Sequence, residues 1–235
     1  MEKRKILITG GNKGIGLAVS RAMLELGHEI VIVAREFETC SLVGVKDVTC
    51  IEYDLSNLDG LSDLAKEVGH IDVLINNAGY MQPKYTYNNY PKEARDKLMN
   101  VDLYAPVELI NLFCESMKEN KYGRIVNTAS IAGQIGHPDI WYGMAKAALI
   151  NATKIYGKML GEYGITVNCV APSPTETDMQ KDNSEERKKE FKKTVSSGRF
   201  AEAEEVAKAI VWLATDAPAY INGTCIDIND CSYPR

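Results

Sequence analysis

KILITGGNKGIG, in which Lys5–Thr9 runs directly into Gly10–Gly16, is the stretch that decides the fold. Lys5–Thr9 is a short apolar run, which is typical of a buried strand. From Gly14 to Leu26 the apolar residues have helical spacing. A glycine turn between a first strand and a first helix lets backbone N–H groups approach a pyrophosphate, and the helix N-terminus adds a positive dipole end. The stretch therefore predicts a nucleotide-binding turn at the start of an α/β fold.

The same alternation of strands and helices continues along the chain. Strands are predicted at Lys5–Thr9, Glu29–Ala34, Val48–Tyr53, Ile71–Ile75, Gly123–Asn127, Ile165–Val170 and Thr224–Ile228, and helices at Gly14–Leu26, Leu58–Val68, Lys92–Asn120, Tyr142–Tyr163 and Ala203–Ala214. This alternation predicts a parallel sheet with helices on both faces. Because no linker, repeat or low-complexity tract divides the chain, we expect residues 1–235 to form a single doubly wound, Rossmann-type domain.

The edge of the sheet and the connection between the second and third strands can be predicted in more detail. Val48–Tyr53 alternates in polarity, which suits a strand at the edge of the sheet. Arg35–Cys50 is short for a crossover between parallel strands, so we expect its helix to have only a turn or two.

Composition excludes several classes of function. A net charge of −5 gives no reason to expect a nucleic acid or an anionic membrane as partner. No stretch approaches the ~20 apolar residues of a membrane span, and the N-terminal apolar run is too short for a signal peptide, so we expect a cytoplasmic protein. The six cysteines form no CxxC pair, and neither they nor the three histidines have zinc spacing, so we expect no metal site.

The end of the second predicted strand bears on the choice of nucleotide. A carboxylate there would suit the 2′-hydroxyl of NAD, but the chain has Arg35. Arg35 and Lys13 can pair with a 2′-phosphate, which favours NADP(H) over NAD(H). Glu36 remains available for the acidic role, and an exposed charge without a ligand is the other interpretation of Arg35.

The next two strands end in further candidates for cofactor binding. Asp54 and Leu55 follow the third strand at the adenine end of such a site, although Asp54 is nearly as well explained as a helix N-cap or turn residue. Asn76, Ala78 and Gly79 belong to the NNAG sequence after the fourth strand, where small residues would let the chain pass close to the adenine ribose.

Three residues further along can do acid–base chemistry. Tyr142 and Lys146 are four residues apart, which places them on one face of a helix. A nearby cation stabilises a phenolate and lowers the pKa of a tyrosine, which makes it a usable proton donor and acceptor. Ser130 follows the fifth strand, at the edge where such sheets bind ligands, and its hydroxyl can bond a substrate carbonyl.

Together these motifs resemble the short-chain dehydrogenase/reductase family, from Thr9 to about Ile228. The shared motifs are TGGNKGIG (Thr9–Gly16), Asp54, NNAG (Asn76–Gly79), Asn100 in MNVD, Ser130, YGMAK (Tyr142–Lys146), the Pro172 turn and YING (Tyr220–Gly223). The resemblance implies hydride transfer between nicotinamide and a carbonyl or carbinol carbon. It implies that Tyr142 exchanges the oxygen's proton while Ser130 orients that oxygen.

The resemblance also implies further roles. Lys146 would lower the tyrosine pKa and bond the nicotinamide ribose, and Asn100 would help to hold a water that links Lys146 to solvent. The implied NADP(H) contacts are Gly10, Asn12, Lys13, Gly14, Ile15, Gly16, Arg35, Asp54, Leu55, Asn76, Ala78, Gly79, Tyr142, Lys146, Pro172, Thr175 and Thr177.

Within the family, the chain looks most similar to 3-oxoacyl-acyl-carrier-protein reductases, through VAPSPTETDM (Val170–Met179) and Gly198–Gly223. That likeness implies an acyl-thioester substrate and a homotetramer or homodimer. The chain departs from it at Pro172-Ser173 and Asp230-Cys231. A sugar, polyol or other small-alcohol dehydrogenase of the same family is the alternative enzyme, and a non-catalytic nucleotide-binding protein is the alternative from another class.

Two segments near the predicted cleft have open interpretations. Glu185–Lys193 (EERKKEFKK) lies where the family has a mobile lid, but its mixed charges favour a solvated helix face. Four tyrosines, namely Tyr80, Tyr85, Tyr87 and Tyr90, either shape a substrate wall or pack against a loop.

Overall fold

The sheet is the frame of the molecule, which we describe from a computed structural model over residues 2–82, 85–180 and 183–235. Its strands are β1 (Lys5–Thr9), β2 (Glu29–Ala34), β3 (Val48–Glu52), β4 (Val73–Asn76), β5 (Gly123–Thr128), β6 (Ile165–Pro172) and β7 (Cys225–Ile228). They form one seven-stranded sheet in the order β3-β2-β1-β4-β5-β6-β7, and every pairing is parallel. The order reverses between β1 and β4, which confirms the doubly wound prediction. β3 lies at the edge, as its alternation indicates.

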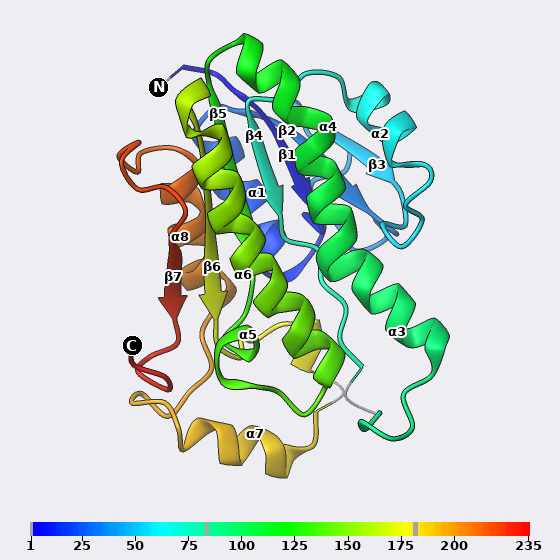
Figure 1. The fold of residues 1–235 in the computed structure, drawn as a ribbon, viewed down its shortest axis with the longest axis vertical. Helices are drawn as coiled ribbons and strands as arrows, with labels where there is room; N and C mark the ends of the chain where they lie inside the picture. The colour runs from blue at the N-terminus through cyan, green and yellow to red at the C-terminus, as the bar shows by residue number, and fades with distance from the viewer. Residues whose placement is uncertain (1, 83–84, 181–182) are drawn as a thin grey trace.

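Helices cover both faces of this sheet (Figure 1). They are α1 (Gly14–Glu25), α2 (Leu61–Val68), α3 (Lys92–Met99), α4 (Ala105–Glu119), α5 (Ala132–Ile135), α6 (Ile140–Leu160), α7 (Glu185–Lys192) and α8 (Ala203–Ala214). α2, α4 and α6 lie on one face, and α1 and α8 lie on the other. No helix in the described ranges is long and apolar enough to cross a membrane.

Each face has its own apolar core, because strand side chains alternate between the two faces. Leu7 and Leu74 belong to the cluster under α2 and α4, whereas Ile8 and Ile75 belong to the cluster under α1 and α8. All four side chains are fully buried. Strands that are apolar on both faces are therefore explained by a sheet that has no solvated face.

The predicted helix between β2 and β3 is wrong. The described chain from Arg35 to Asp47 forms only turns, including hydrogen bonds from Cys40 N to the carbonyl of Phe37 (3.0 Å) and from Val45 N to that of Leu42 (3.2 Å). Positive φ angles at Gly44 (75°) and Asp47 (64°) take the backbone out of the right-handed helical region.

The predicted helical stretch Lys92–Asn120 is interrupted by a π-helical segment, η1 (Asn100–Tyr104), which separates α3 from α4. Such segments are rare and are frequent at functional sites. Other boundaries differ by a few residues. α2 begins at Leu61, after a turn closed by Leu61 N and the carbonyl of Leu58 (3.2 Å), and β4 begins at Val73.

A chain of hydrogen bonds between buried polar side chains connects the middle of the sheet to α6. Asn76 Nδ2 donates to Asn127 Oδ1 (2.9 Å), Asn127 Nδ2 donates to Thr153 Oγ1 (3.0 Å), and Thr153 Oγ1 donates to the carbonyl of Leu149 (2.9 Å). Asn127 and Thr153 are fully buried. Since buried polar groups are costly without partners, this chain fixes α6 relative to β4 and β5.

We predict that Asn127→Ala lowers the free energy of unfolding by about 2–4 kcal/mol, because it leaves the amide of Asn76 and the hydroxyl of Thr153 short of a partner. Urea denaturation measures this change. Asn151→Ala on the exposed side of α6 is the matched control, and we expect it to change the free energy by at most about 0.5 kcal/mol. Equal effects of the two substitutions would contradict the role assigned to the buried chain.

Candidate active site

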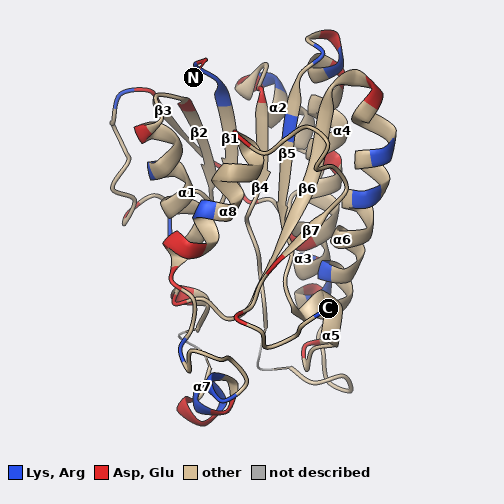
Figure 2. Cartoon of the chain, turned by 90° about the vertical axis from the view of Figure 1, so that its left-hand side faces the viewer, with Lys and Arg blue, Asp and Glu red and all other residues tan. Residues whose placement is uncertain are grey.

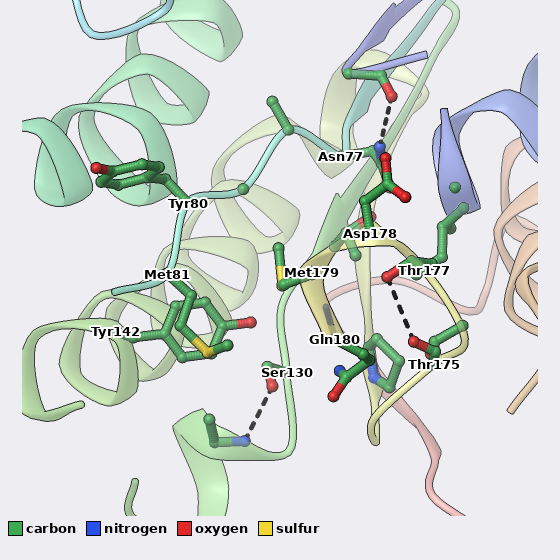
Figure 3. Close-up of a pocket in the computed structure, with 18 of the residues that line it drawn as sticks. Asn77, Tyr80, Met81, Ser130, Tyr142, Thr175, Thr177, Asp178, Met179 and Gln180 are labelled. Carbon is green, nitrogen blue, oxygen red and sulfur yellow. Dashed lines mark hydrogen bonds between the residues drawn. The ribbon is translucent and has the colours of Figure 1, made fainter. Parts of the chain in front are cut away.

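A cavity of about 650 Å³ lies at the carboxyl ends of the parallel strands. Figure 3 shows Tyr142 and Ser130 on one side of it and Thr175 and Thr177 on the other. Most of the residues that the sequence predicts to bind or react line this cavity, namely Gly10, Asn12, Lys13, Gly14, Ile15, Arg35, Asp54, Leu55, Ala78, Gly79, Ser130, Tyr142, Lys146, Pro172, Thr175 and Thr177. The structure thus brings residues from seven separate segments of the chain to one place.

The glycine turn is closely packed against the loop after β4. Gly10 has a φ of +65°, a conformation that favours glycine. A Cβ added at Gly16 would lie 2.1 Å from the carbonyl oxygen of Gly10, so α1 can start this close to β1 only with glycine there. Asn77 Nδ2 donates to the carbonyl of Thr9 (3.2 Å), and Thr9 Oγ1 accepts from Ala78 N (3.1 Å).

The turn fits the pyrophosphate of a dinucleotide. α1 begins at Gly14, which lines the cavity, and its first turn contains no acidic residue. The first N–H groups of a helix have no partner within the helix, and together with the helix dipole they favour an anion.

The cations predicted for the 2′-phosphate have different surroundings. Arg35 lies exposed at the rim of the cavity. Lys13 Nζ lies 3.3 Å from Glu36 Oε1, and both side chains are about half exposed. Asn12 Nδ2 also donates to the backbone carbonyl of Glu36 (2.8 Å). Glu36 therefore neutralises part of the positive charge at this end of the cavity.

Asp54 combines the two roles that the sequence left open. It lines the cavity, and its Oδ1 accepts from Ser56 N (2.9 Å), as in an Asx turn. Burial raises the pKa of the Asp54 carboxyl, but hydrogen bonds from Ser56 and the nearby Lys97 outweigh it and leave the pKa lowered. The carboxylate therefore stays charged at neutral pH.

The three reactive residues come from two elements that meet at the cavity. Ser130 follows β5, and its Oγ accepts from Ala132 N (3.1 Å). Tyr142 and Lys146 lie one turn apart on α6, and Lys146 Nζ is 5.6 Å from the centroid of the Tyr142 ring. Asp139 caps α6 by accepting from Tyr142 N (3.1 Å). All three reactive side chains are buried.

Burial dominates the electrostatics of the phenol. It raises the pKa of Tyr142, and the charge of Asp102 acts in the same direction. Lys146 and a hydrogen bond with Ser130 lower this pKa, as the sequence predicts for Lys146, but they do not outweigh burial. The phenol therefore carries its proton at neutral pH.

Asp102 is the main feature that sequence reasoning missed. Its Oδ1 lies 2.8 Å from Lys146 Nζ, and both side chains are almost completely buried. The sequence does contain a signal, since Asp102 stands in the MNVD motif beside Asn100. Asp102 lies in the π-helical segment η1, and the sequence pattern does not predict that geometry.

Three predicted site residues do not line the cavity. Gly16 acts through close packing of the turn. The side chain of Asn76 is buried and bonds to Asn127. Asn100 Nδ2 donates to the carbonyl of Ser56 (2.9 Å), which ties η1 to the loop after β3.

The aromatic residues that line the cavity differ in part from those that the sequence suggested. Of the four tyrosines between Tyr80 and Tyr90 that the sequence suggested for the substrate wall, only Tyr80 is among the described residues that line the cavity. Tyr90 OH instead donates to Asp139 Oδ2 (3.2 Å). His137 lines the cavity with its ring against that of Tyr142, at a centroid distance of 5.3 Å.

α7 closes one end of the cavity. Figure 2 shows it beyond the carboxyl edge of the sheet, with basic and acidic residues interspersed. Arg187 and Phe191 of α7 line the cavity, and Arg187 Nη2 lies 3.4 Å from His137 Nε2. Lys188 pairs with Glu185 at 2.7 Å. α7 thus has the mixed-charge solvated face that the sequence favoured and also contributes to the cavity wall.

Comparisons with known proteins agree with this geometry. Residues 10–230 match the family described as enoyl-(acyl carrier protein) reductase. The chain is 34% identical to 3-oxoacyl-acyl-carrier-protein reductase FabG of Rickettsia felis, over 95% of this chain and 94% of that one. It is 28% identical to the reductase of the same name from Escherichia coli, over 99% and 98%.

Solved structures show the same architecture. A structure described as a short chain dehydrogenase/reductase family protein superposes with a TM-score of 0.89 at 27% identity, over 97% of each chain. A 4-hydroxyisoleucine dehydrogenase complexed with NADH superposes with a TM-score of 0.92 over 99% of each chain, and at 24% identity it shows the fold alone.

The fold and the matches define an oxidoreductase that acts on CH–OH groups and uses a nicotinamide cofactor. The chain belongs to the short-chain dehydrogenase/reductase family.

We predict that Gly16→Ala raises the dissociation constant for the nicotinamide cofactor at least ~10-fold, or ~1.4 kcal/mol, because the new Cβ must push the first turn of α1 away from the carbonyl of Gly10. Titration of NADPH fluorescence measures the affinity. Ala22→Gly, which destabilises the same helix by about 1 kcal/mol, controls for loss of stability. Unchanged affinity in Gly16→Ala would disprove the close-packing argument.

Proposed function

We propose that the protein is an NADPH-dependent reductase of 3-oxoacyl thioesters carried on acyl carrier protein. The observation that carries the proposal is the grouping of Ser130, Tyr142 and Lys146 on a cavity whose other end is the glycine turn. The likeness to 3-oxoacyl-acyl-carrier-protein reductases over nearly the whole chain supports this choice of substrate.

The bound nicotinamide supplies the hydride in this reaction. The turn from Gly10 to Gly16 would hold the pyrophosphate, Asp54 and Leu55 would border the adenine, and the loop containing Asn76, Ala78 and Gly79 would run past the adenosine ribose. Pro172, Thr175 and Thr177 would border the nicotinamide. Their positions in the cavity wall support these roles for all but Gly16 and Asn76, which support the site from behind.

Tyr142 donates the proton that the reduced carbonyl oxygen takes up. Its raised pKa supports the acid role, because the phenol is protonated at neutral pH before the reaction. Ser130 donates a hydrogen bond to the carbonyl oxygen and orients it. Lys146 stabilises the phenolate that forms and bonds the nicotinamide ribose. Asn100 helps to hold a water that links Lys146 to solvent.

The preference for NADPH rests on Arg35 and Lys13. Both line the cavity at the end of β2, where the 2′-phosphate would lie. A 2′-phosphate competes with Glu36 for Lys13, and the half-exposed pair is weak enough to be exchanged.

We also propose that the protein works in the cytoplasm as a homotetramer or homodimer. All six cysteines are free, which suits a reducing compartment. Ile155 and Met159 of α6 are more than half exposed, and Leu112 of α4 is 37% exposed. These exposed apolar side chains on the neighbouring helices α4 and α6 support self-association through that face.

We predict that the purified protein oxidises NADPH in the presence of a short 3-oxoacyl thioester and that Tyr142→Phe reduces kcat at least ~100-fold, because a general acid typically contributes 10²–10⁴-fold. NADPH absorbance follows the reaction. The affinity for NADPH, measured by fluorescence, should remain nearly unchanged.

Tyr156→Phe on the same helix is the matched control, since the hydroxyl of Tyr156 bonds Asn111 Oδ1 and neither residue lines the cavity. Undiminished turnover in Tyr142→Phe would refute the acid role. Turnover of sugars or polyols but not of thioesters would refute the substrate and favour the alternative dehydrogenase.

We predict that Arg35→Asp weakens NADPH binding at least ~10-fold more than NADH binding, because it replaces a cation beside the 2′-phosphate with an anion. Parallel fluorescence titrations with the two nucleotides measure the difference. Lys46→Asp makes the same charge change at an exposed position outside the cavity. Equal weakening of both nucleotides would mean that Arg35 does not contact the phosphate.

A further inference from the structure

The Lys146 ammonium forms an ion pair with one carboxylate, that of Asp102. Lys146 Nζ lies 2.8 Å from Asp102 Oδ1 and donates to the carbonyl of Thr128 (3.1 Å). The exposed fractions of the two charged side chains are only 3% and 0%. An ammonium has three hydrogens, so these contacts leave one for the cavity, where the phenol of Tyr142 lies.

Asp102 also binds the loop after β4. Its Oδ2 accepts from Tyr80 N (2.9 Å). A Cβ added at Gly79 would lie 3.3 Å from Asp102 Oδ1 and 3.7 Å from Lys146 Nζ, so the loop runs directly over the ion pair. One carboxylate therefore joins η1, the loop after β4 and α6 beneath the cavity.

A fully buried ion pair does not by itself explain stability, since a protein with apolar residues of the same volume at these positions is often as stable or more stable. A functional role for the pair is therefore worth considering. Burial on its own lowers the pKa of Lys146, but the charge of Asp102, the charge of the Tyr142 phenolate and the hydrogen bond to Asp102 together outweigh burial and raise that pKa. Without the carboxylate, Lys146 would be a buried cation with no anionic partner and would release its proton more readily.

Other titratable groups face this pair from the neighbouring elements. Tyr142 lies on α6, Asp139 caps that helix, and Tyr80 and Tyr90 come from the segment between β4 and α3. Asp139 acts on the phenol of Tyr142 and on Asp102, but its bonds go to Tyr142 N, Gln82 N and Tyr90 OH. Lys146 is thus paired with Asp102, whereas Asp139 organises the start of α6.

We propose that Asp102 is a positioning residue for the reaction, which keeps the Lys146 ammonium charged and directed at Tyr142. This inference rests on the proposed function for the roles of Lys146 and Tyr142. Asp102 contacts neither the cavity nor a reacting atom, and it acts through Lys146.

Removal of the carboxylate changes the pH dependence in one direction. Carbonyl reduction needs Tyr142 protonated and Lys146 charged. In Asp102→Asn, the buried Lys146 loses its proton at lower pH, and while it stays charged the phenol also loses its proton at lower pH, because a nearby negative charge is gone. Both effects move the alkaline limb of the kcat/KM profile to lower pH.

The first experiment measures the titration of Lys146 itself, in the full chain without cofactor or substrate. The ¹³Cε resonance of Lys146 is identified by its absence in Lys146→Arg. We expect its titration midpoint in Asp102→Asn to fall by at least about one pH unit, the low end of the effect of an opposite charge at this distance. The buried Asp139→Asn is the matched control, and its Lys146 midpoint should stay near that of the unaltered protein.

The second experiment records kcat/KM against pH for NADPH oxidation with the short 3-oxoacyl thioester. We expect the alkaline limb in Asp102→Asn to fall by at least about one pH unit. An unmoved Lys146 midpoint together with an unmoved limb would overturn the proposal and leave Asp102 a packing role. If the unaltered protein turns over no thioester, the proposed function fails, and the resonance titration still decides whether Asp102 holds the charge.

Asp102→Asn leaves a buried cation unpaired and can prevent folding. The double variant Asp102→Asn/Lys146→Met removes both charges. A double variant that folds where Asp102→Asn does not would support the proposal, because the defect is then the uncompensated charge. If neither folds, Asp102 is needed for the structure whatever the charge of Lys146, and the proposal is wrong.

Discussion

The parallel direction of the strands is the constraint on which the rest of the structure depends. Each parallel pair requires a crossover, and every crossover in this chain except the one from β2 to β3 places a helix on one face of the sheet. Both faces are then buried, and all the carboxyl ends meet at one edge. The cavity at this edge is bordered by the glycine turn after β1, the loops after β4 and β5, and the end of β6. The site is thus a consequence of the topology before any particular side chain is considered.

Within that frame, buried polar groups determine how well the site is positioned. The amide chain from Asn76 through Asn127 to Thr153 fixes α6 against the sheet. The ion pair of Lys146 and Asp102 fixes the other end of the same region. Such groups are costly unless every partner is in place, so they favour a single arrangement of the elements. The reactive Tyr142 lies one turn before Lys146 on the same helix, α6.

The sequence predicted the parts of the structure that local patterns encode. The glycine turn, the positions of all seven strands to within two residues, and the pairing of Tyr142 with Lys146 on one helix face all follow from spacing or periodicity. The position of Ser130 after the fifth predicted strand located it at the cavity. The short helix expected from the length of the crossover between β2 and β3 does not form, because Gly44 and Asp47 turn the chain there.

Contacts between distant segments were harder to predict. Asp102 and Lys146 are far apart in the sequence, and no periodic pattern indicates that they meet. The position of Asp102 depends on the π-helical turn in η1, which apolar spacing does not reveal. The sign of the pKa shift of Tyr142 was also missed, because it depends on how completely the phenol is buried rather than on its neighbour in the helix.

Because of the π-helical segment, the relative orientation of α3 and α4 depends on the number of residues between β4 and β5. A π-turn accommodates about one extra residue within a helix, and each residue advances an α-helix by about 100°. α3 and α4 therefore meet with a rotational offset, and η1 sets that offset. The loss of one residue here would leave a smooth amphipathic helix of ordinary composition whose second half faces a different direction. Insertions and deletions, rather than substitutions, are thus the changes to which this helix is most sensitive, and an alignment that treats it as one uniform helix would misplace the residues that follow.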